Sequence, residues 1–306
     1  MYHVSMSFFS IAALVFSLVI ACPAFARSLN ELEDLDEIGQ GRISAMDAEI
    51  KRHPGQWELY EKKAKLYRNM LQEEKALTEF EKAIRLNPRE PRLYRQKAEL
   101  YMSLDRNAEA MREYHRLLVH DPDDAGALAG IAVILQAGGK GRGDNAEALK
   151  YFDRAIKADP NSNTSHEFRG ALYMKLGRYG EAARDFDFVV RHKPDDLKAL
   201  FMRADAYLKG RDYPRALADY TRIIELHGDV AEPYVIRGDV YRSVGSIRKA
   251  RSDYQSAIAL EPPREVMARA HFGLAMVYHK LGESKLEKEE LSRARALGYF
   301  SGKRSR

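Results

Sequence analysis

Small residues recur along the chain at a fixed interval, and each is followed by an aromatic residue and then by a proline or glycine. The small residues lie 34 positions apart, except for one interval of 38, and the aromatic residue follows after four positions: Ala76 and Phe80, Ala110 and Tyr114, Ala148 and Phe152, Ala182 and Phe186, Ala216 and Tyr220, Ala250 and Tyr254. Twelve positions after the same alanines stand Pro88, Pro122, Pro160, Pro194, Gly228 and Pro262. This self-similarity predicts a stack of supersecondary units that cover each other's apolar faces.

A second pattern precedes each alanine and supplies the other half of the unit. Tyr67, Tyr101, Tyr173, Tyr207 and Tyr241 stand nine positions earlier, with Ala or Gly three positions before each tyrosine. Spacings of three and four residues define one face of an α-helix. Gly177, Gly210 and Gly245 separate the two halves and are typical of turns. Each unit is therefore expected to be two antiparallel helices, and the fold to be all-α.

These positions resemble the tetratricopeptide repeat (TPR) family. The sixth unit carries the family's pattern almost completely, with Gly238, Tyr241, Ala250, Tyr254 and Pro262 in the expected places. The resemblance implies a right-handed α-solenoid of helix-turn-helix units, whose first helices line a concave, peptide-binding groove. Seven repeats are expected within residues 57–301, at 57–90, 91–124, 125–162, 163–196, 197–230, 231–264 and 268–301. We expect this solenoid to be one continuous body without an internal linker.

Two of the repeats depart from the pattern. The third has four extra residues, expected in the glycine-rich segment 138–143 between its helices. The seventh follows about three extra residues after Pro262, and it has Glu287 in the alanine position and Leu291 in the aromatic position. A more polar last repeat is typical of a cap that closes the stack.

Basic and acidic residues also alternate with the repeat. Five pairs are separated by 16 positions, with the base in the first helix and the acid in the second: Lys63 and Glu79, Lys97 and Glu113, Arg169 and Asp185, Arg203 and Asp219, Arg237 and Asp253. The third repeat replaces both members, with Ile131 and Tyr151. We interpret these pairs as ion pairs between the two helices; the alternative is that both positions are simply solvated. As exposed pairs they would contribute only about 0.2–1 kcal/mol each.

The N-terminal segment has a different character. Residues 6–22 are apolar or small without a charge, and Ala24-Phe25-Ala26 forms a small-x-small site, so residues 1–26 are predicted to be a secretory signal. Val19-Ile20-Ala21-Cys22 also resembles a bacterial lipoprotein box, and a retained membrane anchor is a third alternative. The expected location is exported, periplasmic or secreted, or membrane-anchored through Cys22. Residues 27–56 are expected to cap the stack with a degenerate half repeat, and 302–306 to form a basic tail.

Composition and motifs argue against most chemistry. A net charge of +5 from 50 basic and 45 acidic residues, with no face that collects the bases, does not predict nucleic-acid binding. No histidine pair has metal-ligand spacing, and no phosphate loop or nucleophile motif is present. We therefore expect no cofactor, no metal and no enzymatic activity.

Binding of a protein partner remains, and the TPR resemblance implies which residues are available for it. Groove positions on the first helices of the later repeats hold an apolar strip with carboxylates beside it: Glu167, Phe201, Asp205, Val235, Asp239, Phe272 and Met276. The expected ligand is a peptide segment with apolar and basic residues, although adjacent repeats could instead cover the two phenylalanines. The expected function is a non-catalytic scaffold or adaptor in the cell envelope. The alternative is a membrane-anchored lipoprotein or a regulatory subunit of an envelope enzyme complex.

Overall fold

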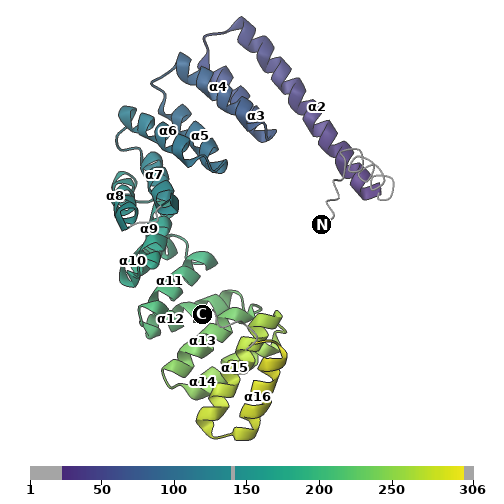
Figure 1. Cartoon of the computed structure of the whole chain (residues 1–306), viewed down its shortest axis with the longest axis vertical. Coiled ribbons are helices and arrows are strands. Elements are labelled where there is room, and N and C mark those ends of the chain that lie inside the picture. Colours follow the sequence, from purple (N-terminus) through teal and green to yellow (C-terminus); the bar gives the residue numbers. More distant parts are fainter. Residues whose placement is uncertain (1–22, 139–141, 300–306) are drawn as a thin grey trace, which may run out of the picture. The chain divides into compact units, whose positions relative to one another are not determined.

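The computed structural model describes residues 23–138 and 142–299, and side chains are described for 38–138 and 144–299. All regular elements in these ranges are α-helices, without a strand (Figure 1). The helices are α2 (Pro23–Arg52), α3 (Trp57–Asn69), α4 (Glu73–Leu86), α5 (Pro91–Ser103), α6 (Asn107–His120), α7 (Ala125–Gly138), α8 (Arg142–Ala158), α9 (Asn163–Lys175), α10 (Tyr179–His192), α11 (Leu197–Lys209), α12 (Tyr213–Leu226), α13 (Ala231–Ser243), α14 (Ile247–Ala259), α15 (Arg264–Leu281) and α16 (Ser284–Ala296). The predicted all-α class is confirmed.

Consecutive helices pack in pairs, and one pair falls in each predicted repeat. Helix α3 packs on α4, α5 on α6, α9 on α10, α11 on α12, α13 on α14 and α15 on α16. In the third repeat, α7 and α8 share one cluster of buried residues. The second helix of a pair also contacts the first helix of the next pair, as α10 contacts α11 and α14 contacts α15. Helix α15 begins at Arg264, before the predicted start of the seventh repeat at 268, so the extra residues after Pro262 lengthen this helix.

The chain divides into two compact units, residues 1–130 and 131–306, with the division inside α7. Because this division falls inside a helix and not in a linker, the expectation of one continuous body stays a prediction. In a stack each repeat contacts only its neighbours, so few contacts cross any one helix and the stack can divide there. Part of the glycine-rich segment, residues 139–141, lies outside the described residues; Gly138 ends α7 and Arg142 begins α8. The right-handed superhelical path stays a prediction.

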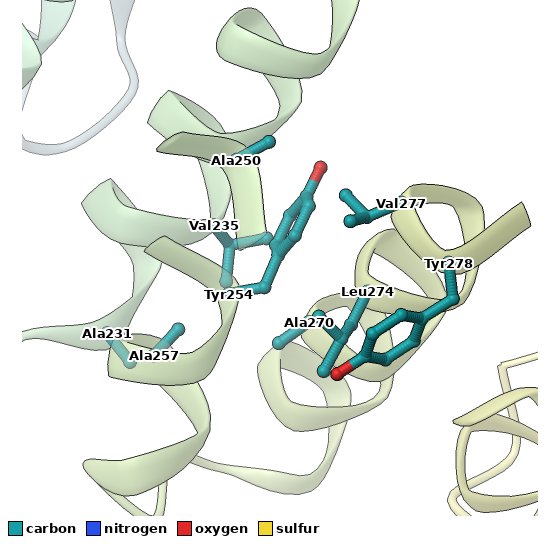
Figure 2. Packing of buried hydrophobic residues seen from close by; sticks show 9 residues of the cluster. All are labelled: Ala231, Val235, Ala250, Tyr254, Ala257, Ala270, Leu274, Val277 and Tyr278. Atoms are coloured by element: carbon teal, nitrogen blue, oxygen red, sulfur yellow. The ribbon is translucent and has the colours of Figure 1, made fainter. Parts of the chain in front are cut away.

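The repeated small residues permit close helix packing around the repeated aromatic residues. Tyr254 of α14 is fully buried in a cluster with residues of α13 and α15 (Figure 2). A Cβ atom added at Gly238 of α13 would lie 2.9 Å from the Tyr254 ring, and one at Gly273 of α15 would lie 2.4 Å from it. The tyrosine therefore fills a slot between two first helices that exists because both positions lack a side chain.

The turn between the helices of a repeat requires a left-handed residue at one position. Gly177, Gly245 and Gly282 take this position with φ of 73°, 79° and 74°. In the fifth repeat the left-handed residue is Arg211, at φ 61°, whereas Gly210 ends α11 with φ −75°. The turn lies where the sequence predicts it, but Gly210 is not the residue that needs glycine's conformational freedom.

The predicted ion pairs between paired helices are confirmed. The distances between nitrogen and oxygen are 3.5 Å for Lys63 and Glu79, 3.1 Å for Lys97 and Glu113, 2.6 Å for Arg169 and Asp185, and 2.7 Å for both Arg203 with Asp219 and Arg237 with Asp253. All five acids are buried, so the expectation of exposed pairs is wrong. Removal of one partner from a buried pair typically costs about 3–5 kcal/mol.

Each base also reaches the residue 16 positions before it, on the second helix of the preceding repeat. These second partners are Asp47, Glu81, Asp153, Asp187 and, for Arg237, the hydroxyl of Thr221. The bases thus form a ladder in which each one joins two successive second helices. The sequence contains this spacing too, because the same interval of 16 applies in both directions.

Hydrogen bonds within the ladder lower the pKa of one of its carboxylates, Asp185. Burial alone would raise the pKa of Asp185, but hydrogen bonds from Arg169 and His166 outweigh burial and lower it from its ordinary value. His166 donates from Nδ1 to the same carboxylate at 2.9 Å. In the seventh repeat, where Leu274 takes the basic position, His271 and Arg293 bind the buried Glu290 instead. These histidine and carboxylate pairs were not predicted from the sequence.

The segment predicted to cap the N-terminal end of the stack forms most of one long helix. Helix α2 is continuous from Pro23 to Arg52, so the acidic stretch 31–37 is helical. Its C-terminal part packs on α3, with Ile43 buried and Asp47 in the ladder. Residues 1–22, which include most of the predicted signal and Cys22, lie outside the described residues. No helix in the described part of the chain is both long enough and apolar enough to span a bilayer.

Candidate partner-binding face

Four first helices of the second compact unit carry the residues predicted to bind a partner. Helix α9 holds Glu167, α11 holds Phe201 and Asp205, α13 holds Val235 and Asp239, and α15 holds Phe272 and Met276. Apart from Val235, these residues are only partly buried. We call the six residues other than Val235 the first-helix face.

Val235 does not belong to this face. Its side chain is 0% exposed and lies in the cluster around Tyr254 (Figure 2). The prediction for Val235 is therefore wrong. Val235 occupies the same position of the repeat as Phe201. Its smaller, branched side chain is buried in the cluster, whereas the larger Phe201 of the preceding repeat stays partly exposed.

The two phenylalanines of the face each contact another ring of the chain. Phe201 meets the buried Tyr220 edge to face, with ring centres 6.3 Å apart. Phe272 stacks on Tyr299, with ring centres 4.5 Å apart, next to a hollow of about 530 Å³. Arg264 anchors this C-terminal segment to α15 by donating hydrogen bonds to the backbone oxygens of Leu297 and Ala296. Intramolecular packing thus accounts for part, but not all, of each ring's surface.

The carboxylates of the face already have basic partners. Glu167 pairs with Lys198 at 2.8 Å, which joins α9 to α11. Asp205 pairs with Lys209 at 2.8 Å within α11. Asp239 lies 3.5 Å from Arg242 and also accepts a hydrogen bond of 2.7 Å from the Tyr254 hydroxyl. A basic group of a ligand would have to compete with these partners.

Two further residues connect neighbouring first helices and were not predicted. Arg269 of α15 lies 3.5 Å from both Asp239 and Glu232 of α13. Lys198, Glu232 and Arg269 occupy the same position of successive repeats, three residues before Phe201, Val235 and Phe272. Because positions i and i+3 share one face of a helix, this spacing could have identified them from the sequence.

The described residues contain no group of three or more His, Cys, Asp or Glu side chains placed to hold a metal ion. The face itself offers aromatic and thioether surface next to exposed ion pairs. Such a surface can bind another polypeptide through apolar contacts and exchange of charged partners.

Comparison with protein families matches the tetratricopeptide repeat over more than half of the chain. One model of this repeat matches residues 140–183, 169–231 and 237–298, and a second matches 72–134. The family predicted from the residues is confirmed. No curated protein matches the chain.

Three solved structures of similar fold are distantly related to this chain in sequence. The C-terminal part of a TPR repeat-containing protein from Cytophaga hutchinsonii has a TM-score of 0.65 at 16% identity and covers 78% of this chain and 95% of its own. MamA from Desulfovibrio magneticus RS-1 has a TM-score of 0.51 at 22% identity, covering 59% and 98%. YrrB, described as a TPR protein with an unusual peptide-binding site, has a TM-score of 0.51 at 19% identity, covering 61% and 93%. At these identities the similarity shows the fold alone.

Proposed function

Because the chain belongs to the tetratricopeptide repeat family, we propose that it is a non-catalytic scaffold that binds a peptide segment of a partner protein on its first-helix face. Proteins of this family mediate protein-protein interactions, and the solved structure of YrrB is described by its peptide-binding site. The ligand expected here has apolar side chains for Phe201, Phe272 and Met276, and a basic group for the carboxylates.

The observation that carries this proposal is the exposure of the ion pairs on the face. The Lys198 and Lys209 side chains, which pair with Glu167 and Asp205, are 68% and 52% exposed. Exposed pairs of this kind contribute only about 0.2–1 kcal/mol, so a basic residue of the ligand can replace either lysine at small cost. Covering a partly exposed phenylalanine stabilises a complex by up to about 1.5–3 kcal/mol, which favours the exchange.

The variant Phe201→Ala with Asp205→Lys removes one apolar contact and reverses one charge on the face. A matched control, Phe168→Ala with Asp229→Lys, makes the same changes in composition at exposed residues outside it. Circular dichroism first establishes that both variants are folded. In quantitative capture of partners from a cell extract, the first variant should lose proteins that the native chain and the control retain. An unchanged set of partners would contradict the proposal.

We propose further that the protein acts in the cell envelope, which rests on the apolar N-terminal segment and the Ala24-Phe25-Ala26 site. Soluble export predicts a mature chain that begins at Arg27, whereas an acylated Cys22 predicts a membrane lipoprotein. The mass of the mature N-terminus distinguishes these two forms. A chain that retains Met1 in the native host would contradict both.

A further inference from the structure

A second candidate site lies in a hollow of about 820 Å³ between α10, α11 and the start of α12. Tyr179, Ala183, Ala206, Tyr207 and Gly210 form its apolar wall. At 100° per residue, Ala206 and Gly210 lie roughly 140° and 180° around α11 from Phe201. The hollow therefore faces away from the first-helix face and is not part of the site proposed above.

The hollow exists because two of its wall positions lack the large side chain that most other repeats carry there. Gly210 occupies the position that holds Met70, Leu104, Leu176, Val244 and Leu281 in five other repeats; only the third repeat also has a glycine there, Gly138. Ala183 occupies the position that holds Leu77, Met111, Leu149 and Leu217, with Arg251 in the sixth repeat. Both small residues line the same hollow, and a Cβ atom added at Gly210 would lie 3.4 Å from the Cβ of Tyr179 on α10 of the preceding repeat. Among the described repeats, only the junction between the fourth and fifth combines alanine, at Ala183, with glycine, at Gly210.

Arginines dominate the rim of the hollow. Arg184, Arg191 and Arg215 line it together with Asp187 and Asp212. Both aspartates already have basic partners: Asp187 binds Arg203 and Arg191, and Asp212 lies 3.4 Å from Arg215. Arg184 is exposed and forms no ion pair with any residue that the structure describes.

The arginines of the rim and the apolar residues of the wall favour different parts of one ligand. Guanidinium groups bind carboxylates through paired hydrogen bonds. The two tyrosine rings and the alanines provide a surface for one bulky apolar side chain. A ligand that satisfies both is acidic, with an apolar group at its centre.

We propose that this hollow binds an acidic peptide segment of a partner protein, with one aromatic or aliphatic side chain between Tyr179 and Tyr207 and flanking carboxylates on Arg184 and Arg191. The scaffold then has two sites of opposite preference, because the first-helix face is expected to bind a basic segment. Two different partners can occupy the chain at once, and the protein joins them.

The test uses the full chain and a labelled peptide, Glu-Glu-Phe-Glu-Glu, with Lys-Lys-Phe-Lys-Lys as the reversed probe, in fluorescence anisotropy. Gly210→Leu fills the hollow with the residue that Leu104 and Leu176 provide in other repeats. The backbone at Gly210 has nearly the φ and ψ of those leucines, so the variant should fold normally. Arg184→Glu reverses the unpaired charge, and Arg248→Glu is the control for a change in net charge at an exposed arginine elsewhere.

The acidic peptide should bind the native chain, and Gly210→Leu should raise its Kd by about tenfold or more because the side chain occupies the site. Arg184→Glu should raise the Kd by about fivefold, while Arg248→Glu and Phe201→Ala leave it unchanged. This last variant separates the hollow from the first-helix face, so either proposal can fail alone.

Three outcomes would overturn the proposal. The first is an acidic peptide that does not bind, or that binds Gly210→Leu as well as the native chain. The second is competition by inorganic phosphate at equal concentration, which would make the hollow a site for small anions. The third is a native chain that self-associates in sedimentation while Gly210→Leu does not, which would make the hollow an interface between copies of this chain.

Discussion

Replacement of one ion pair of the ladder by apolar residues tests how the ladder stabilises the stack. The pair of the fifth repeat is suitable because Arg203 donates two hydrogen bonds to Asp219, of 2.9 and 2.7 Å. The changes are Arg203→Met, Asp219→Leu and the two together. The third repeat is a natural precedent for the double change, since Ile131 and Tyr151 occupy the same two positions there.

The two single changes should differ in cost. The Asp219 side chain is 7% exposed, and Arg203 is its only ionic partner among the described residues. Arg203→Met therefore leaves a buried carboxylate alone and should cost about 3–5 kcal/mol. Asp219→Leu leaves Arg203 with Asp187, which is 2.7 Å away and 36% exposed. That remaining pair should reduce the cost to about 2–3 kcal/mol.

The double change should cost less than the sum of the single changes by about 2 kcal/mol or more, because it removes both charges. Urea unfolding followed by circular dichroism measures the three losses, and equal slopes with denaturant concentration establish that the variants unfold comparably. Losses that add within about 0.5 kcal/mol would refute the ladder as a coupled structure. Exchanging the two charges is a poorer test, since the new carboxylate would face Asp187.

Three other predictions follow from the packing and the charges. Gly273→Ala should lower the free energy of unfolding by about 1–3 kcal/mol, because the added methyl group would lie 2.4 Å from the Tyr254 ring; Gly180→Ala, which meets no atom within 4 Å, should not lower it, and equal losses in urea unfolding would contradict the packing. Arg211→Gly should raise the same free energy by roughly 0.5–1 kcal/mol, because relief of the left-handed backbone exceeds the entropic cost of glycine, and a loss of stability in thermal unfolding would contradict this. Asp185 has a lowered pKa in the folded protein, so its contribution is present above its ordinary pKa of 3.8 and is lost as the pH falls below that value; Asp185→Asn should flatten the decline in melting temperature below about pH 4, and an unchanged decline would refute the assignment.

Much of the fold was predictable because the repeat multiplies a weak local signal. One alanine and one tyrosine predict little, but the same pair at 34-residue intervals predicted the helix pairs. A base and an acid 16 positions apart in five repeats likewise predicted the ion pairs of Lys63, Lys97, Arg169, Arg203 and Arg237. Burial of these pairs was not predictable in the same way. It depends on the second helix of the preceding repeat, which covers each base from the other side.

The candidate face was predicted less well, for a related reason. A position in the repeat determines which way a side chain points from its helix, but not how closely the next repeat approaches it. Phe201 and Val235 occupy the same position, yet the first is partly exposed and the second is buried. The hollow at Gly210 likewise requires two small residues from different repeats to meet.

The sequence by itself determined the period of the stack, the two helices of each repeat, and the residues that pair across them, because these depend on contacts within about one repeat length. The tertiary structure alone decided which charges are buried, which turn residue adopts the left-handed conformation, and where the surface is hollow. These properties depend on the distance between successive helix pairs. That distance is set jointly by several side chains, such as Gly238, Tyr254 and Gly273, rather than by any one position.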